Sequence, residues 1–217
     1  CSRVPDQWRI IDTYQDINYN QKRDIMSCVI GVEGGHVIGN DITKVEHFFD
    51  RGMKYLGLTW NNSNSIGTSA KDEFENRVSL KRIGLTKFGR KVVKECNRLG
   101  VMIDISHAGE KTFWDVINLT SEPIIASHSS VYTLCPHYRN LKDDQLVAIG
   151  KNGGVVFVNF YPGYIDSTYL EKEAMINMKY EFERQALSEQ YDASSISYWH
   201  AESKILKHEK NRIVPDI

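Results

Sequence analysis

The stretch TKFGRKVVKECNRLGVMIDISH, Thr86–His107, contains a helix and the strand that follows it. In its first half, apolar residues recur on one helical face and lysine or arginine on the other, which predicts an amphipathic helix from Thr86 to Leu99. Gly100 supplies the helix stop. The second half is a short apolar run that ends at a polar tip, His107, and this is typical of a buried strand in a parallel sheet.

The same alternation of helix and strand recurs along the chain. Short apolar runs predict strands at 28–33, 55–60, 101–107, 123–128 and 155–160, and a helix-containing segment separates each run from the next. The expected helices lie at about 40–51, 86–99, 110–119 and from Asp143 onward. This regular alternation predicts parallel βαβ units with right-handed crossovers. The N-terminal stretch is expected to be irregular, and residues 71–82 to form a charged surface segment.

The pattern favours an α/β fold of the (β/α)8 barrel type. No glycine-rich phosphate loop follows any of the apolar runs, which argues against a dinucleotide-binding sheet. Eight strands typically need about 250 residues, so the 217-residue chain is expected to represent the barrel incompletely. We therefore predict a single domain over 1–217, with strand-helix repeats at about 28–165 and a helical insertion at about 169–210.

Composition excludes some functions and leaves others open. A hydrophobic content of 41% and a charged content of 25% are ordinary for a globular protein. The net charge of -1 gives no reason to expect a nucleic acid or an anionic membrane as a partner. No run approaches the roughly 20 apolar residues of a membrane span. The cysteines lack metal-knuckle spacing, and Cys28 and Cys96 are expected to be buried free thiols.

Three polar residues stand at the ends of predicted strands. Glu33, His107 and His128 each close a short apolar run. Parallel α/β enzymes place their chemistry at the carboxyl ends of the strands, and one carboxylate with two imidazoles makes a plausible zinc ligand set. The pattern points to metal-assisted hydrolysis. Taken singly, Glu33 could instead cap the following loop, and each histidine could be a hydrogen-bonded structural residue.

Several short stretches carry a family resemblance. They run in order along about 28–165 and read Val-Glu33-Gly-Gly-His, Tyr55-Leu-Gly-Leu-Thr, Gly84-Leu-Thr-Lys-Phe-Gly-Arg90, Asp104-Ile-Ser-His107, Ser127-His128-Ser-Ser, Arg139-Asn140 and Val158-Asn-Phe-Tyr161. Together they closely resemble the renal or membrane dipeptidases, the zinc-dependent peptidase family M19. The resemblance implies a (β/α)8 barrel with a centre of two zinc ions that hydrolyses dipeptides, with a metal-bridging hydroxide as the nucleophile. It also implies tolerance of a D-residue at the C-terminal position.

The resemblance assigns roles residue by residue. Glu33 matches the carboxylate that bridges the two metals, and we count it as catalytic for that reason. His107 and His128 match imidazole ligands of one metal. Arg139 matches the arginine that holds the terminal carboxylate of the substrate, in line with the fit between a guanidinium fork and a carboxylate. Tyr164 matches a substrate-side tyrosine.

Three departures from the family pattern stand out. The family opens with a His-x-Asp pair that supplies two ligands to the other metal, and this chain contains no such pair. It also lacks the later Gly-Ser-Asp-Phe-Asp-Gly-like segment. Both gaps lie toward the ends, so we interpret the sequence as an incomplete segment of a family member. Trp60 stands where the family often has a histidine that polarises the scissile carbonyl, and we expect Trp60 to contact the substrate.

Two other functions stay open, as do the partners. The first is a different metal-dependent barrel amidohydrolase, such as a deaminase or a lactonase. The second is a non-catalytic binding protein that has lost part of the metal centre. Asp104 is expected to enter strand packing or to hydrogen-bond a ligand histidine. The resemblance implies a dipeptide as substrate, a homodimer as the assembly, and export to the periplasm or membrane anchoring as candidate locations.

Overall fold

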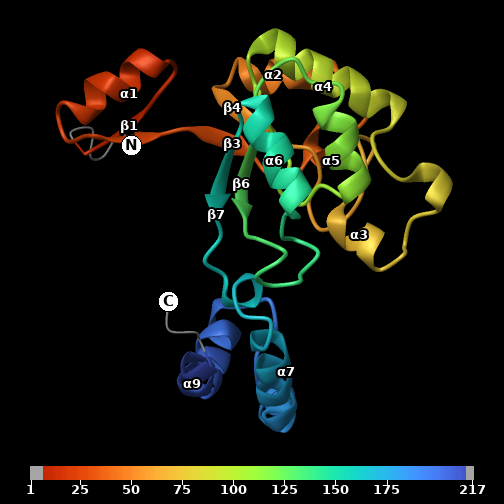
Figure 1. The fold of residues 1–217 in the computed structure, drawn as a ribbon. Helices are drawn as coiled ribbons and strands as arrows, with labels where there is room; N and C mark the ends of the chain where they lie inside the picture. Colours follow the sequence, from red (N-terminus) through yellow and green to blue (C-terminus); the bar gives the residue numbers. More distant parts are fainter. Residues whose placement is uncertain (1–6, 214–217) are drawn as a thin grey trace. The chain divides into compact units, whose positions relative to one another are not determined.

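The computed structural model describes residues 7–213, which divide into two compact units (Figure 1). The first unit comprises the chain up to Ser129 together with Leu141–Val158. The second comprises Ser130–Asn140 and the chain from Asn159 onward. The single domain expected over 1–217 stays a prediction.

The first unit is built on a parallel sheet of five strands. Its order is β3 (Ile30–Val32), β4 (Met53–Gly57), β5 (Met102–Asp104), β6 (Ile125–Ser129) and β7 (Val155–Val158), and all neighbouring pairs are parallel. The order in space follows the order in the chain without a reversal, as in a barrel wall and unlike a dinucleotide-binding sheet. The parallel α/β class and the five predicted strands are thus confirmed.

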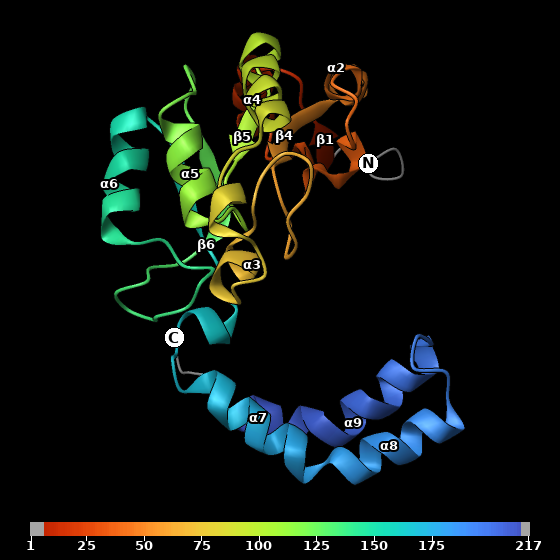
Figure 2. The same ribbon diagram turned by 90° about the vertical axis from the view of Figure 1, so that its right-hand side faces the viewer.

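Four helices connect the strands and cover one face of the sheet (Figures 1 and 2). They are α2 (Thr43–Phe49), α4 (Lys87–Leu99), α5 (Glu110–Ile117) and α6 (Asp143–Asn152). The helix α4 begins where its sequence predicts, because the Thr86 hydroxyl accepts a hydrogen bond from the Gly89 N–H. It ends at Gly100, whose φ of 73° closes the helix in the left-handed conformation.

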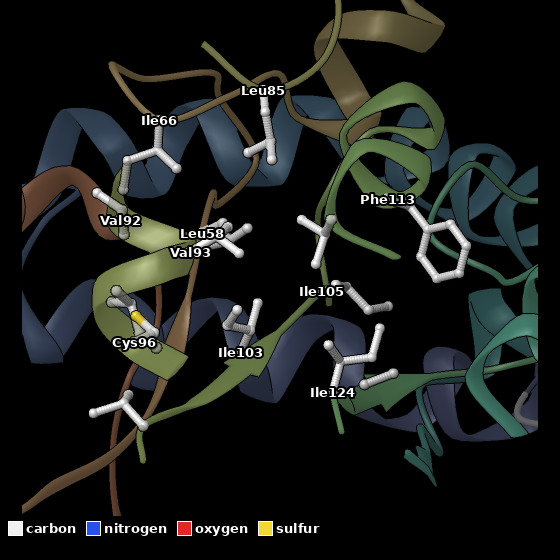
Figure 3. Packing of buried hydrophobic residues seen from close by; sticks show 14 of the residues in the cluster. Leu58, Ile66, Leu85, Val92, Val93, Cys96, Ile103, Ile105, Phe113 and Ile124 are labelled. Carbon is white, nitrogen blue, oxygen red and sulfur yellow. The ribbon is translucent and has the colours of Figure 1, made fainter. Parts of the chain in front are cut away.

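The core lies between these helices and the sheet (Figure 3). From the sheet side it contains Leu56 and Ile103, which are partners in the β4–β5 register. From the helices come Val92, Cys96 and Phe113, each at most 1% exposed. Full burial of one such side chain contributes about 1.5–3 kcal/mol, so the core holds the strand ends in fixed positions. Cys96 and the half-buried Cys28 are free thiols.

Short elements lie between the main ones. The 3-10 helix η1 (Gly35–Ile38) follows β3, and η2 (Leu80–Arg82) precedes α4. A helix not foreseen from the sequence, α3 (Ala70–Phe74), lies partly within the expected surface segment. The Ser69 hydroxyl caps it by accepting from the Asp72 N–H.

The N-terminal part is not irregular, and that prediction was wrong. A small parallel sheet pairs β1 (Trp8–Ile10) with β2 (Met26–Cys28), and α1 (Tyr14–Gln21) connects the two strands. The expected strand at 28–33 is accordingly divided between β2 and β3. These three-residue strands were missed because their residues are mostly exposed and show no apolar run.

The second unit contains a helical group in the range 169–210, where the sequence predicts helices, and the interpretation of this group as an insertion stays a prediction. A 3-10 helix, η3 (Pro162–Tyr164), leads into α7 (Tyr169–Lys179), α8 (Glu181–Gln190) and α9 (Ile196–Ile213), drawn in blue in Figure 2. Tyr169, Ile176 and Tyr198 are buried. Within residues 7–213, no helix combines the length and the apolar character needed to cross a bilayer.

Candidate metal centre

The three polar strand-end residues come from three neighbouring parts of the sheet. Glu33 follows β3 directly, His107 lies just beyond β5, and His128 belongs to the end of β6. The backbone of His107 has a φ of 69°, a left-handed conformation that a residue with a side chain seldom adopts. Its carbonyl accepts a hydrogen bond from the Ala70 N–H at 2.8 Å, which holds this turn in place. Such backbone outliers concentrate at functional sites.

The side-chain atoms of these residues converge on one point. His107 Nε2 lies 3.0 Å from Glu33 Oε1 and 2.9 Å from His128 Nε2. His128 Nε2 lies 3.1 Å from the same Glu33 oxygen. A tetrahedral zinc ion with ligands at about 2.0–2.1 Å separates those ligands by about 3.3 Å, so an opening of a few tenths of an ångström accommodates the ion. One carboxylate oxygen and two imidazole nitrogens are also a donor set that zinc prefers.

The site is anchored on one side and open on the other. The His107 side chain is only 8% exposed, whereas that of His128 is 30% exposed and that of Glu33 51%. The two imidazoles therefore rest on the protein, while the carboxylate faces solvent. This combination lets a metal ion and a small substrate reach ligands whose positions are fixed.

Each histidine has a hydrogen-bond partner on the ring nitrogen that points away from the site. His107 Nδ1 donates to Asn61 Oδ1 at 3.0 Å, and His128 Nδ1 lies 2.7 Å from the Ser127 hydroxyl. Metal-binding imidazoles almost always have such an outer partner, because it fixes the ring orientation and the tautomer. Asn61 was not among the residues predicted from the sequence. The sequence feature that could have identified it is its place as a polar residue directly after the end of the predicted strand 55–60.

Asp104 lies beneath the histidines and is 1% exposed. Its Oδ1 accepts from the N–H groups of Ser106, at 2.9 Å, and of Ser127, at 3.0 Å. Its Oδ2 accepts from the Ser127 hydroxyl at 2.5 Å. The sequence predicted strand packing or a hydrogen bond to a ligand histidine, and the structure places the Ser127 hydroxyl between Asp104 and His128.

Two aromatic side chains lie close to the candidate ligands. The ring centroid of Trp60 is 6.3 Å from that of His107, and Trp60 is 48% exposed. On β4, the Tyr55 ring lies so close to Gly31 that a Cβ on Gly31 would clash with it. Burial, followed by the negative charges of Asp104 and Glu33, raises the pKa of Tyr55. Its hydroxyl therefore stays protonated at neutral pH.

The second unit brings together the two residues that the resemblance assigns to the substrate. The Arg139 guanidinium carbon lies 5.6 Å from the Tyr164 ring centroid, a cation–π arrangement, and Arg139 is only 4% exposed. The His137 ring packs against the Tyr164 ring at a tilt, with the ring centroids 4.6 Å apart. His137 Nδ1 accepts a hydrogen bond from the backbone N–H of Arg139 at 3.1 Å. Burial, with the Arg139 charge second, lowers the pKa of His137 to about 4.

A parallel α/β sheet with a carboxylate and two imidazoles converging at its carboxyl edge defines a candidate metal-binding α/β protein. The comparison with known families makes this specific. Residues 1–201 match the membrane dipeptidase family, Peptidase family M19, and the chain belongs to this family.

Relatives support the assignment and show how much of the family fold the chain spans. It is 32% identical over 198 residues to Dipeptidase 3 of Mus musculus, covering 91% of this chain and 39% of that protein. It thus spans about two fifths of that relative's length.

Two solved structures have the same fold over this part. A metallo peptidase from Rhodobacter sphaeroides, liganded with a phosphinate mimic of the dipeptide L-Ala-D-Ala, matches with a TM-score of 0.68 and 29% identity. The match covers 76% of this chain and 47% of that one. An amidohydrolase from Pseudomonas aeruginosa matches with a TM-score of 0.69 and 28% identity, over 77% of this chain and 49% of the other.

Proposed function

We propose that the whole protein is a zinc-dependent dipeptidase and that Glu33, His107 and His128 hold metal. The observation that carries this proposal is the convergence of three donor atoms at the carboxyl edge of the sheet, all within 4.8 Å of one another. Membership of the M19 family supports it. Metal dependence fits the donor set, and zinc is the ion that one carboxylate and two imidazoles favour.

The chain's own residues divide the work as follows. Glu33 would hold metal as the negatively charged oxygen ligand, in the position that the resemblance assigns to the bridging carboxylate. His107 and His128 supply neutral nitrogen donors whose outer partners keep the rings in place. The chemistry that a metal ion would supply there is a lower pKa for a coordinated water and polarisation of the scissile carbonyl. Trp60 offers a half-exposed aromatic surface to the substrate.

Arg139 selects the substrate class in this proposal. Its guanidinium fork matches the free terminal carboxylate of a dipeptide, and Tyr164 supports it from one side. A D-residue at the C-terminal position is included, because the related Rhodobacter sphaeroides peptidase was solved with a mimic of L-Ala-D-Ala. A homodimer and a location outside the cytoplasm are further proposals that rest on the family resemblance alone.

Hydrolysis of L-Ala-L-Ala and L-Ala-D-Ala by the zinc-loaded protein tests the proposal. We expect both dipeptides to be cleaved, and His107→Ala to lose at least about 100-fold in rate because it removes a buried ligand. His47→Ala serves as the matched control, since His47 is an exposed histidine on α2. An unchanged rate in folded His107→Ala would contradict the assignment. Ammonia release from a nucleobase without peptide cleavage would favour the deaminase alternative.

A further inference from the structure

A partly buried hydrogen-bonded chain leads from the buried Asp104 to the candidate ligand His128. The register of β5 and β6 pairs Asp104 with Ile125, so Asp104 and Ser127, two residues further along β6, lie on the same face of the sheet. Asp104 Oδ2 lies 2.5 Å from the Ser127 hydroxyl, and that hydroxyl lies 2.7 Å from His128 Nδ1. Asp104 and Ser127 therefore connect two strands directly below the converging donor atoms.

The chemistry of the groups sets the direction of each hydrogen bond. Asp104 accepts two backbone N–H groups on Oδ1, and its Oδ2 accepts from the Ser127 hydroxyl. The Ser127 hydroxyl must therefore donate its single proton to Oδ2. Its lone pairs then face His128 Nδ1, so Nδ1 carries the imidazole proton and donates it to Ser127.

We propose that Asp104 and Ser127 are positioning residues that hold His128 in the Nδ1–H tautomer and leave its Nε2 lone pair for a metal ion. This inference rests on the proposed metal centre. The Ser106 hydroxyl adds a second anchor, because it accepts from the His128 backbone N–H at 3.1 Å. The buried carboxylate also makes the imidazole a stronger donor to metal.

The two histidines of the site are oriented by different hydrogen-bond partners. His107 donates to the neutral carboxamide of Asn61, whereas His128 is linked through one hydroxyl to a buried carboxylate. With both Nδ1 atoms protonated, the three atoms that face one another, two Nε2 atoms and the Glu33 oxygen, are all acceptors. A divalent cation placed among these three acceptors would remove their mutual repulsion. The hydrogen-bonded chain that keeps the proton on Nδ1 should therefore raise the affinity for metal.

Asp104→Asn tests the inference most sharply, because it preserves shape and reverses the direction of donation. The new NH2 group would donate to the Ser127 hydroxyl, which would then donate to His128 Nδ1 and move the ring proton to Nε2. Long-range ¹H–¹⁵N spectra of the metal-free protein at about pH 8, where an ordinary histidine is neutral, report the tautomer directly. We expect Nδ1–H for His128 in the wild type and Nε2–H in the variant.

Affinity for Zn²⁺ alone, measured by competition with a chelator, gives the second readout. We expect Asp104→Asn and Ser127→Ala to bind Zn²⁺ about 10- to 100-fold more weakly, and Ser127→Thr, which keeps the hydroxyl, to bind like the wild type. Ser129→Ala is the control, since Ser129 is a serine of the same strand and is 1% exposed. Its affinity should not change.

The outcomes separate this inference from the proposed function. An Nε2–H tautomer in the wild type, or unchanged tautomer and affinity in a folded Asp104→Asn, would overturn it. If Asp104→Asn fails to fold, equal Zn²⁺ affinities for Ser127→Ala and Ser127→Thr would overturn it instead. A wild type that shows the Nδ1–H tautomer but binds no Zn²⁺ would support the positioning role and contradict the zinc centre.

Discussion

His107 combines a buried side chain with a backbone conformation that costs energy. The left-handed φ of 69° costs a residue with a Cβ about 1–2 kcal/mol. The cost is tolerated because the His107 carbonyl and ring are both held, by the Ala70 N–H and by Asn61. Strain of this kind, at a residue that also converges on Glu33 and His128, supports a functional reason for the turn.

The stability of the second unit should depend on the protonation of His137. Its pKa is about 4 in the folded protein, against about 6.5 in an unfolded chain. Between these values the unfolded chain binds more protons, so stability falls as pH drops from about 6.5 to 4 and levels off below. The variant His137→Phe keeps an aromatic ring beside Tyr164 and Arg139 but has no titrating group there. The share of the stability loss between pH 6.5 and 4 that His137 causes should therefore be absent in this variant.

Urea unfolding of the wild type and of His137→Phe at several pH values measures this effect. The difference in unfolding free energy between the two proteins should change between pH 6.5 and 4, in the sense that the wild type loses more. A difference that is constant over this range would show that His137 does not titrate in this way.

The three convergent residues could be predicted from the sequence because apolar runs mark the strands and therefore show where each strand ends. Glu33, His107 and His128 each close such a run, and parallel strands meet at one edge. The positions of Asn61 and Ser127 relative to the imidazoles could not be predicted from the sequence. These positions depend on the path of the loop after β4 and on the β5–β6 register; the polar residue after the strand marks Asn61 as a candidate, but no local pattern shows which side chain it contacts.

At the level of elements, α4 depends on a close approach that only glycine allows. A Cβ on Gly89 would lie 1.9 Å from the Ile66 carbonyl oxygen, a backbone atom that cannot move aside cheaply. By contrast, a Cβ on the exposed Gly150 of α6 would point into open space. Close packing therefore requires glycine in α4, whereas nothing in the structure requires it in α6.

Alanine at these two positions should act in opposite directions. Gly89→Ala should destabilise the protein by about 1–3 kcal/mol, because it forces α4 away from the loop that carries Ile66. Gly150→Ala should stabilise it by up to about 1 kcal/mol, because alanine is the better helix former. Chemical denaturation measures both, and equal shifts in the two variants would contradict the close packing of α4.

The elements predicted correctly are those with long periodic signals. The helix α4 has a full amphipathic pattern, a threonine cap and a glycine stop, and each of these appears in the structure. The strands β1 and β2 have three residues each and are mostly exposed, so their formation depends on pairing between distant segments. Local patterns cannot report such pairing.

At the level of the whole molecule, the order of the strands and one cluster of candidate ligands define the site. The strands follow one another in chain order, and the donor atoms meet at their carboxyl ends. The two related structures share the fold over the 76–77% of this chain that they match. The fold class could be predicted from alternation alone, whereas membership of the family rests on the order of short motifs.

Zinc content, measured on folded protein purified without chelator, tests the central claim most directly. We predict at least about one zinc ion per wild-type chain and none above background in a folded His128→Ala variant, with His47→Ala unchanged. Removal of the metal by a chelator should lower the melting temperature of the wild type and not that of His128→Ala. A folded wild type without zinc, or a His128→Ala variant that retains it, would contradict the account.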